Sequence, residues 1–190
     1  MGFTILELLF VVSIAGTLAA MAIPQGLRGI DDFHTRSAAR YVAQRLAAAR
    51  FEAIKRSAAH GLAFEATGDD YRMSLVVDGN RNGLRTIELQ RGIDRTLGEA
   101  ERLDTHFASV SFGIVPGIPD ADGASSGGTD GVRIGTSKLL VMNADGTATP
   151  GTLYVRGAAR SQYAVRVLGS TGRVRLLKFD IATARWVSVS

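Results

Sequence analysis

Two arginines near the end of the chain have the spacing of a phosphate-binding pair. They follow the turn residue Gly172, and on a β-strand Arg173 and Arg175 project from the same face. Guanidinium groups bind phosphate oxygens through paired hydrogen bonds, and Arg166 lies on the preceding predicted strand. The pattern indicates either a strand that binds a polyanion or a solvated hairpin whose arginines pair with acidic residues elsewhere.

The segment at residues 78–83 offers oxygen atoms at alternate positions. Asp78, Asn80 and Asn82 are spaced as at the start of a calcium-binding loop. The bidentate carboxylate that completes such a loop is not in place, because Glu88 falls one residue short of it. A tight hairpin turn, which favours Asn and Gly at positive φ, explains the same residues. A weak calcium site and a turn are both compatible with this segment.

No constellation of catalytic residues is evident elsewhere. The three histidines, His34, His60 and His106, are scattered and lack the spacing of metal ligands. There is no phosphate-binding P-loop and no dinucleotide fingerprint. The chain has no cysteine, so thiolate and disulfide chemistry are excluded. We therefore expect a protein that is not an enzyme and that needs no cofactor.

One carboxylate stands inside an apolar run at the start of the chain. From Phe3 to Ile23 there are 21 residues and a single charge, Glu7, and the run stops at Pro24. Roughly 20 apolar residues suffice to cross a bilayer. A charge inside such a helix costs on the order of 3 kcal/mol, so Glu7 needs a partner or a purpose. A plain membrane anchor would not carry it.

These N-terminal residues resemble the processing site of type IV prepilins and type II secretion pseudopilins. Gly2 matches the glycine after which a prepilin peptidase cuts, Phe3 the residue that is then methylated, and Glu7 the glutamate five residues into the mature chain. Pro24 also matches a proline that is common in the family. The resemblance implies that Glu7 pairs with the N-terminal ammonium of a neighbouring subunit during assembly, and a buried charge pair of this kind is tolerable only when both partners are present. The leader would be a remnant of two residues, 1–2, without the basic residues usual in the family.

The rest of the chain resembles, more loosely, the GspH/FimT family of minor pilins and pseudopilins. The residues that carry this likeness are 78–83, 143–147 and 172–175. The resemblance implies a single-pass protein of the bacterial inner membrane with its head in the periplasm. Its partners would be prepilin peptidase, other pilin or pseudopilin subunits, and DNA or secreted cargo.

Two functions follow from this resemblance. The first is a structural subunit of a type II secretion pseudopilus. The second is a FimT-like minor pilin of a type IV pilus that acts in DNA uptake, in which Gly172, Arg173 and Arg175 match a DNA-binding motif. Such binding would be directed to the DNA backbone and sensitive to salt.

Charge is divided unevenly along the 190 residues, whose net charge is +4. Residues 62–131 carry 6 Lys or Arg against 12 Asp or Glu, a net charge of −6. Residues 132–190 carry 9 against 2, a net charge of +7. Two such blocks can fold against each other or present a basic face to a polyanion.

The elements that must position these residues are one long helix and a series of short strands. Residues 3–60 have helical character, with Val42, Leu46, Ala49 and Ala53 forming an apolar stripe. A kink or local melting is expected after Pro24, and Asp31 and Asp32 are expected to cap the restart. Strands are predicted at residues 62–67, 71–78, 84–90, 106–112, 132–134, 139–143, 153–156, 163–168, 174–180 and 186–189.

The predicted fold class is α+β and resembles that of type IV pilins. Residues 3–24 form a transmembrane or filament-core helix, and residues 25–61 form the amphipathic second half of that helix. Residues 62–190 form a head of antiparallel strands with a long loop at 116–131.

Overall fold

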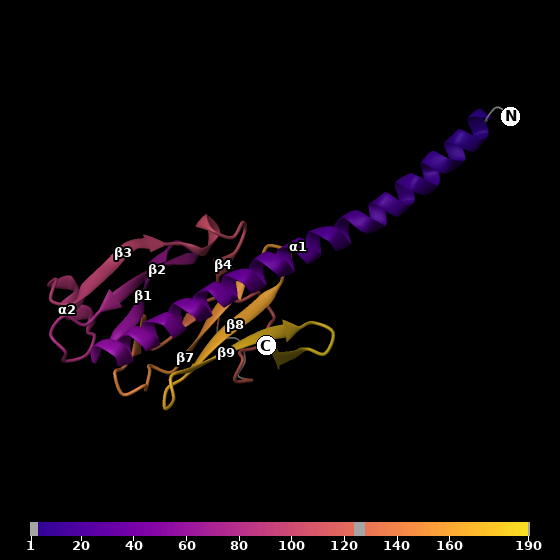
Figure 1. Cartoon of the computed structure of the whole chain (residues 1–190). Helices are drawn as coiled ribbons and strands as arrows, with labels where there is room; N and C mark the ends of the chain where they lie inside the picture. The colour runs from indigo at the N-terminus through magenta and orange to yellow at the C-terminus, as the bar shows by residue number, and fades with distance from the viewer. Residues whose placement is uncertain (1–3, 124–127, 190) are drawn as a thin grey trace.

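A long helix protrudes from a head of antiparallel strands (Figure 1). The computed structural model describes residues 4–123 and 128–189, with the side chains of residues 21–24 aside. Helix α1 is Ile5–Arg56, and its second half lies against the head. This arrangement confirms the predicted α+β fold class. The head consists of β1 His60–Thr67, β2 Asp70–Val77, α2 Thr86–Gln90, β3 Arg95–Glu101, a 3₁₀ turn Leu103–Thr105, β4 Ser111–Phe112, β5 Val132–Arg133, β6 Leu139–Met142, β7 Gly151–Arg156, β8 Gln162–Leu168, β9 Arg173–Asp180 and β10 Arg185–Ser188.

Helix α1 runs through Pro24 as one element of 52 residues. Thr4 caps its start by accepting a hydrogen bond from the Glu7 N–H at 3.3 Å, and Ser57 ends it in the left-handed conformation at φ 49°. The predicted restart with an aspartate cap is therefore wrong. A proline costs a helix one backbone hydrogen bond, and the apolar and alanine-rich residues on either side continue it.

The second half of α1 is amphipathic, as the apolar stripe predicted. Val42, Leu46, Ala49 and Ala53 are at most 2% exposed, and Ala38 and Ala39 extend the stripe toward the stalk. Five of these six side chains are as small as alanine or valine, which lets the helix approach the strands closely. The stripe packs into the main core of the head.

Two antiparallel sheets share this helix. One sheet has the strand order β3-β2-β1-β6 and the other has the order β10-β9-β8-β7-β4, with β5 also paired to β7. The core beneath α1 draws Leu62 and Met73 from the first sheet and Leu153 and Val165 from the second. The helix therefore fastens both sheets through one apolar layer.

Two of the strand predictions were wrong and one strand was missed. Residues 84–90 contain the short helix α2, whose Leu89 packs with the buried Leu84. Of residues 106–112, only Ser111–Phe112 form a strand. The missed strand β3 is an edge strand whose first six residues are exposed, so its sequence has no alternation of apolar and polar residues.

The predicted loop at 116–131 contains no strand or helix within its described part and covers the outer face of the second sheet. We call residues 114–122 the strap. Its buried Ile114, Val115 and Ile118 form a second small core with Tyr154 and Phe179. The strap is held at both ends. At its start the Val115 N–H donates to Gln162 Oε1 at 2.7 Å. Near its end the Trp186 Nε1–H donates to the Pro119 carbonyl at 2.9 Å and the Ala121 N–H donates to the Tyr154 hydroxyl at 2.9 Å.

A polar group fixes α1 at the point where it leaves the head. We call Asp32, Tyr163 and Lys178 the neck cluster. The Tyr163 hydroxyl donates to Asp32 Oδ1 at 3.1 Å, and Lys178 Nζ lies 2.8 Å from the same oxygen. Asp31 beside it accepts the Ser161 N–H at 3.2 Å. The two aspartates expected to cap a helix instead join α1 to the second sheet.

A second polar group fixes α1 to the first sheet. We call Tyr41, Arg45, Glu101 and His106 the Glu101 cluster. The Glu101 carboxylate accepts the Tyr41 hydroxyl at 2.8 Å and Arg45 Nη2 at 2.7 Å, and His106 Nε2 lies 3.0 Å away. Burial alone would raise the pKa of Glu101, but the three hydrogen bonds outweigh it and hold that pKa below its ordinary value.

Candidate functional site

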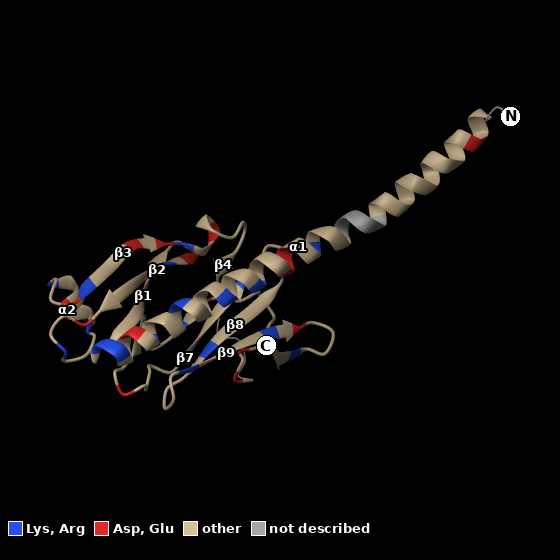
Figure 2. Cartoon of the chain, in the orientation of Figure 1, with Lys and Arg blue, Asp and Glu red and all other residues tan. Residues whose placement is uncertain are grey.

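The first candidate site is the free half of α1, which carries a single charge. Its apolar side chains point in every direction and are widely exposed, from 82% at Ile5 to 46% at Ile14. Among the described residues α1 is the one helix long and apolar enough to cross a membrane, and its most apolar window is not buried against the molecule. Figure 2 shows a single acidic residue on this stalk, and in the sequence the next charged residue after Glu7 is Arg28. A helix that is apolar over its whole circumference is typical of segments that pack against lipid or against other helices.

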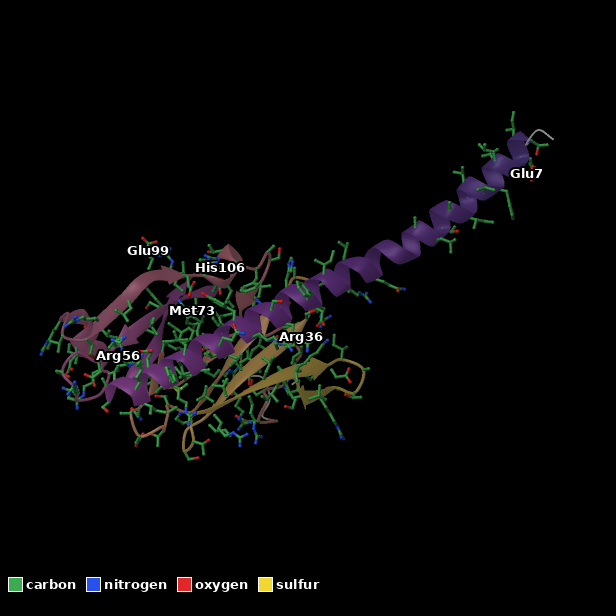
Figure 3. All side chains as sticks on the ribbon, viewed as in Figure 1. Glu7, Arg36, Arg56, Met73, Glu99 and His106 are labelled. Atoms are coloured by element: carbon green, nitrogen blue, oxygen red, sulfur yellow. The ribbon has the colours of Figure 1, made fainter. Side chains whose placement is uncertain are left out.

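Glu7 occupies the first turn of α1, far from the head (Figure 3). An acidic side chain is favoured there, because the free N–H groups of the first turn carry a partial positive charge. Its carboxylate makes no hydrogen bond or ion pair with any of the residues placed by the structure. The predicted processing residues Gly2 and Phe3 lie outside the described residues.

The second candidate site is the hairpin between β8 and β9, which contains Gly172. This glycine has φ +58°, and its N–H donates to the Leu168 carbonyl at 2.8 Å. A β-carbon added to Gly172 would stand 2.5 Å from the Gly146 carbonyl oxygen and 2.9 Å from Arg50 Nε. Both the backbone angle and the close packing therefore require glycine here.

Arg173 and Arg175 project from the face of the second sheet that is turned away from α1. Val174 and Leu176 alternate with them and pack toward the main core under the helix. Both arginines are exposed, and neither makes a hydrogen bond or an ion pair within residues 4–123 and 128–189. The structure thus places the two predicted residues side by side on one open surface, as the period of a strand requires.

Two further arginines, Arg133 and Arg166, lie in line with Arg175. The sequence analysis placed only Arg166 near the pair. The register pairs Arg133 with Thr152, Thr152 with Arg166 and Arg166 with Arg175, across β5, β7, β8 and β9. We call Arg133, Arg166 and Arg175 the arginine row. Arg166 was expected near the pair, whereas Arg133 lies more than thirty residues earlier and only the strand pairing brings it into the row.

The strap neutralises two of the three arginines in this row. Asp120 pairs with Arg133, and Asp122 Oδ1 lies 2.5 Å from Arg166 Nη2. The oppositely charged halves of the sequence therefore do fold against each other, while Arg173 and Arg175 remain open to solvent. The surface that remains can bind an extended polyanion along the edge of the strap.

The segment with the calcium-like spacing is a hydrogen-bonded turn. The Asp78 carboxylate accepts the N–H groups of Asn80, Arg81 and Gly83 at 2.6–3.0 Å. Asn80 and Asn82 turn their side-chain amides toward the Glu88 carboxylate at 3.1 and 2.9 Å. The side chains of Asp78, Asn80 and Asn82 are thus hydrogen-bonded to the turn backbone and to Glu88. No group of three or more His, Asp or Glu in the described part of the chain could hold a metal ion.

No protein-family model and no curated protein matches this chain. A similar solved structure is that of the minor pseudopilin EpsH from the type 2 secretion system of Vibrio cholerae. The match has a TM-score of 0.48 and 18% sequence identity, and it covers 76% of this chain and 97% of that chain.

Proposed function

We propose that the protein is a minor pseudopilin, a structural subunit and not an enzyme. Its precursor is anchored in the bacterial inner membrane, with the apolar half of α1 in the bilayer and the head in the periplasm. Prepilin peptidase cuts after Gly2 and methylates Phe3, and the mature chain joins other subunits in the pseudopilus of a type II secretion system. The observation that carries the proposal is a lone carboxylate, Glu7, in the first turn of an otherwise apolar stalk, with no partner among the described residues.

The chemistry of Glu7 is what separates a filament subunit from a simple anchor. Cleavage before Phe3 leaves an ammonium group at the new N-terminus, four residues from Glu7. When stalks pack side by side, the ammonium of one subunit can lie against the Glu7 carboxylate of its neighbour. A buried ion pair contributes little net stability, but removing one partner leaves a buried charge that costs about 3–5 kcal/mol. Glu7 therefore sets the register of assembly.

The test replaces Glu7 with alanine in the full-length chain. Glu7→Ala should insert into the membrane and be processed at Gly2 as the original chain is, but its incorporation into filaments should fall at least tenfold. Glu7→Asp, which keeps the charge on a shorter side chain, serves as the matched control and should recover part of the incorporation. Filament content is measured by immunoblotting of sheared filaments against the membrane fraction. Normal incorporation of Glu7→Ala would overturn the register role.

A second candidate function is supported by the open arginines of the head. In a FimT-like minor pilin of a type IV pilus, Arg173 and Arg175 would bind the phosphates of DNA during uptake, with Gly172 shaping the turn beside them. The observation in favour is that both side chains are exposed and unpaired among the described residues, in line with Arg166. Each phosphate contact made by such a residue steepens the salt dependence of binding.

The DNA test uses the full-length chain in detergent micelles at two salt concentrations. Arg173→Ala together with Arg175→Ala should weaken DNA binding and lower the slope of log K against log salt by about 2, because two phosphate contacts are lost. Arg81→Ala with Arg91→Ala removes the same charge from exposed positions at the turn and short helix beside the first sheet, and it should leave the slope nearly unchanged. Equal effects of the two pairs, or no binding at low salt, would remove DNA from the function and leave the pseudopilin role.

A further inference from the structure

A cleft lies at the end of the head from which the stalk emerges. It has a volume of about 480 Å³ and brings together the neck of α1, the turn between β7 and β8, the strap and the tip of the β9–β10 hairpin. In Figure 1 this hairpin extends from the same end of the head as the free half of α1. The cleft is lined by Arg28, Gly117, Ile118, Ala159, Arg160, Phe179, Ile181 and Ala184.

Two arginines at this cleft are open to an external ligand. Arg28 lies on α1 and Arg160 on the turn before β8, and both are exposed. Neither side chain makes a hydrogen bond or ion pair within the part of the chain that the structure describes. Arg160 also has φ +73°, an unfavourable angle for a side chain that is not glycine. Two unpaired guanidinium groups beside one cleft can bind an anionic headgroup.

The acidic side chains near these arginines are occupied by the head itself. Asp31 accepts the Ser161 N–H, and Asp32 is held in the neck cluster. Asp180 accepts the Ala182 N–H at 3.0 Å and the Thr183 hydroxyl at 2.8 Å. These contacts occupy the three carboxylates, and none of the described residues forms an ion pair with Arg28 or Arg160. Arg185, after the hairpin tip, adds a third exposed arginine at this end of the head.

An apolar side chain stands beside the arginines at the tip of a hairpin. Ile181 is 68% exposed and follows β9 directly, while Leu27 and Ile30 on the adjacent turns of α1 are 60% and 57% exposed. An exposed apolar tip next to cations is the composition of surfaces that settle into the headgroup region of a bilayer.

The length of the stalk places this surface at the depth of the headgroups. Residues 5–23 of α1 span about 29 Å along the helix axis, close to the roughly 30 Å of a hydrocarbon core. Arg28 follows about 7.5 Å further along the axis, and the headgroup layer on each side is about 5–7 Å thick. Arg28 can therefore reach lipid phosphates with its long side chain while the apolar half of α1 spans the bilayer.

We propose that before assembly the head docks on an anionic membrane surface through Arg28, Arg160 and Ile181. The inference rests on the proposed function, because it assumes that the free half of α1 spans the inner membrane. The docked head would hold α1 at one tilt and would keep the cleft closed by lipid until the subunit leaves the bilayer.

The test exploits the absence of cysteine, since one introduced cysteine is then the sole site for a fluorescent label. Full-length Ile181→Cys, labelled with NBD, is reconstituted in vesicles of phosphatidylcholine with or without phosphatidylglycerol. A nitroxide attached to lipid headgroups should quench the label strongly in the anionic vesicles and weakly in the neutral ones. Adding Arg28→Gln and Arg160→Gln should shift the ratio of docked to free heads back by about 30-fold, the effect of two basic side chains at an anionic surface.

Two control labels separate the possible outcomes. Ser170→Cys, exposed on the hairpin at the other end of β8, should stay unquenched in both kinds of vesicle. Ser13→Cys on the stalk should be quenched by a nitroxide on the acyl chain in both, and a failure there would refute the membrane role in the proposed function. Quenching at Ser13→Cys without any dependence of Ile181→Cys on anionic lipid, or a dependence that survives the double Arg→Gln change, would overturn the docking proposal alone.

Discussion

The two halves of α1 contain similar apolar residues in opposite surroundings. In the stalk they cover the whole circumference, and Leu6 and Phe10 are 80% and 68% exposed. In the head half the buried ones form one narrow stripe, and Leu46 is fully buried against the strands, whereas Phe51 on the outer side is 64% exposed. The difference shows that hydrophobic content does not identify the environment of a helix, whereas the angular distribution of its apolar residues does.

The sharpest test of this comparison truncates one leucine in each half. Leu46→Ala should lower the free energy of unfolding of the head by about 2–5 kcal/mol, because it leaves a cavity in a packed core. Leu9→Ala, which is the same chemical change at a residue 62% exposed, should leave that free energy unchanged. Thermal unfolding of the full-length chain in detergent, followed by circular dichroism, measures both. A loss of head stability in Leu9→Ala would mean that the stalk is not independent of the head.

A second test addresses the boundary between the halves, at the neck cluster. Asp32→Ala should destabilise the head by about 1–2 kcal/mol, because the buried Tyr163 hydroxyl loses its acceptor. A double-mutant cycle with Tyr163→Phe should show coupling between the two residues, since they share one hydrogen bond. Membrane insertion of the stalk should be unaffected. Additive effects in the cycle would mean that the contact does not fix the neck.

The smallest expected effect is a loss of stability at acid pH that belongs to the head half alone. The pKa of Glu101 is lower in the folded protein than in the unfolded chain. Its carboxylate therefore stabilises the fold fully above the pKa of the unfolded chain, about 4.3, and this contribution is lost as the pH falls through the folded pKa. Glu101→Gln should be less stable at neutral pH and should lose this part of the pH dependence. Chemical denaturation at several pH values would measure it, and an unchanged profile would contradict the role of the Glu101 cluster.

The parts of the fold that could be predicted are those governed by local periodicity. Val42, Leu46, Ala49 and Ala53 repeat at helical spacing, and the structure buries all four. Strand β3 could not be predicted, because both of its faces are exposed and burial imposes no pattern on it. Nor could the role of Asp32, whose partner Tyr163 lies 131 residues away along the chain.

The candidate sites also differ in whether local spacing or strand pairing brings their residues together. The pair Arg173 and Arg175 follows from the two-residue period of a strand, and Glu7 stands out because it interrupts an apolar run. Arg133 comes into line with Arg175 only because β5 pairs with β7, and no local pattern in the sequence predicts that pairing. The calcium-like spacing at residues 78–83 is explained by the turn, because the Asp78 carboxylate accepts the N–H groups of Arg81 and Gly83.

The unbroken course of α1 makes the stalk a lever. Asp32 at the neck and Glu7 near the tip are 25 residues apart, which is about 37 Å along a helix axis. If a change in the contacts between α1 and the head tilted the helix by about 5°, Glu7 would move sideways by about 3 Å over that length. This displacement is about the donor–acceptor distance of a hydrogen bond. If the proposed role of Glu7 holds, the accuracy with which one subunit presents its carboxylate to the next is set at the other end of the helix, by the contacts of Asp32 with the second sheet and of Glu101 with α1.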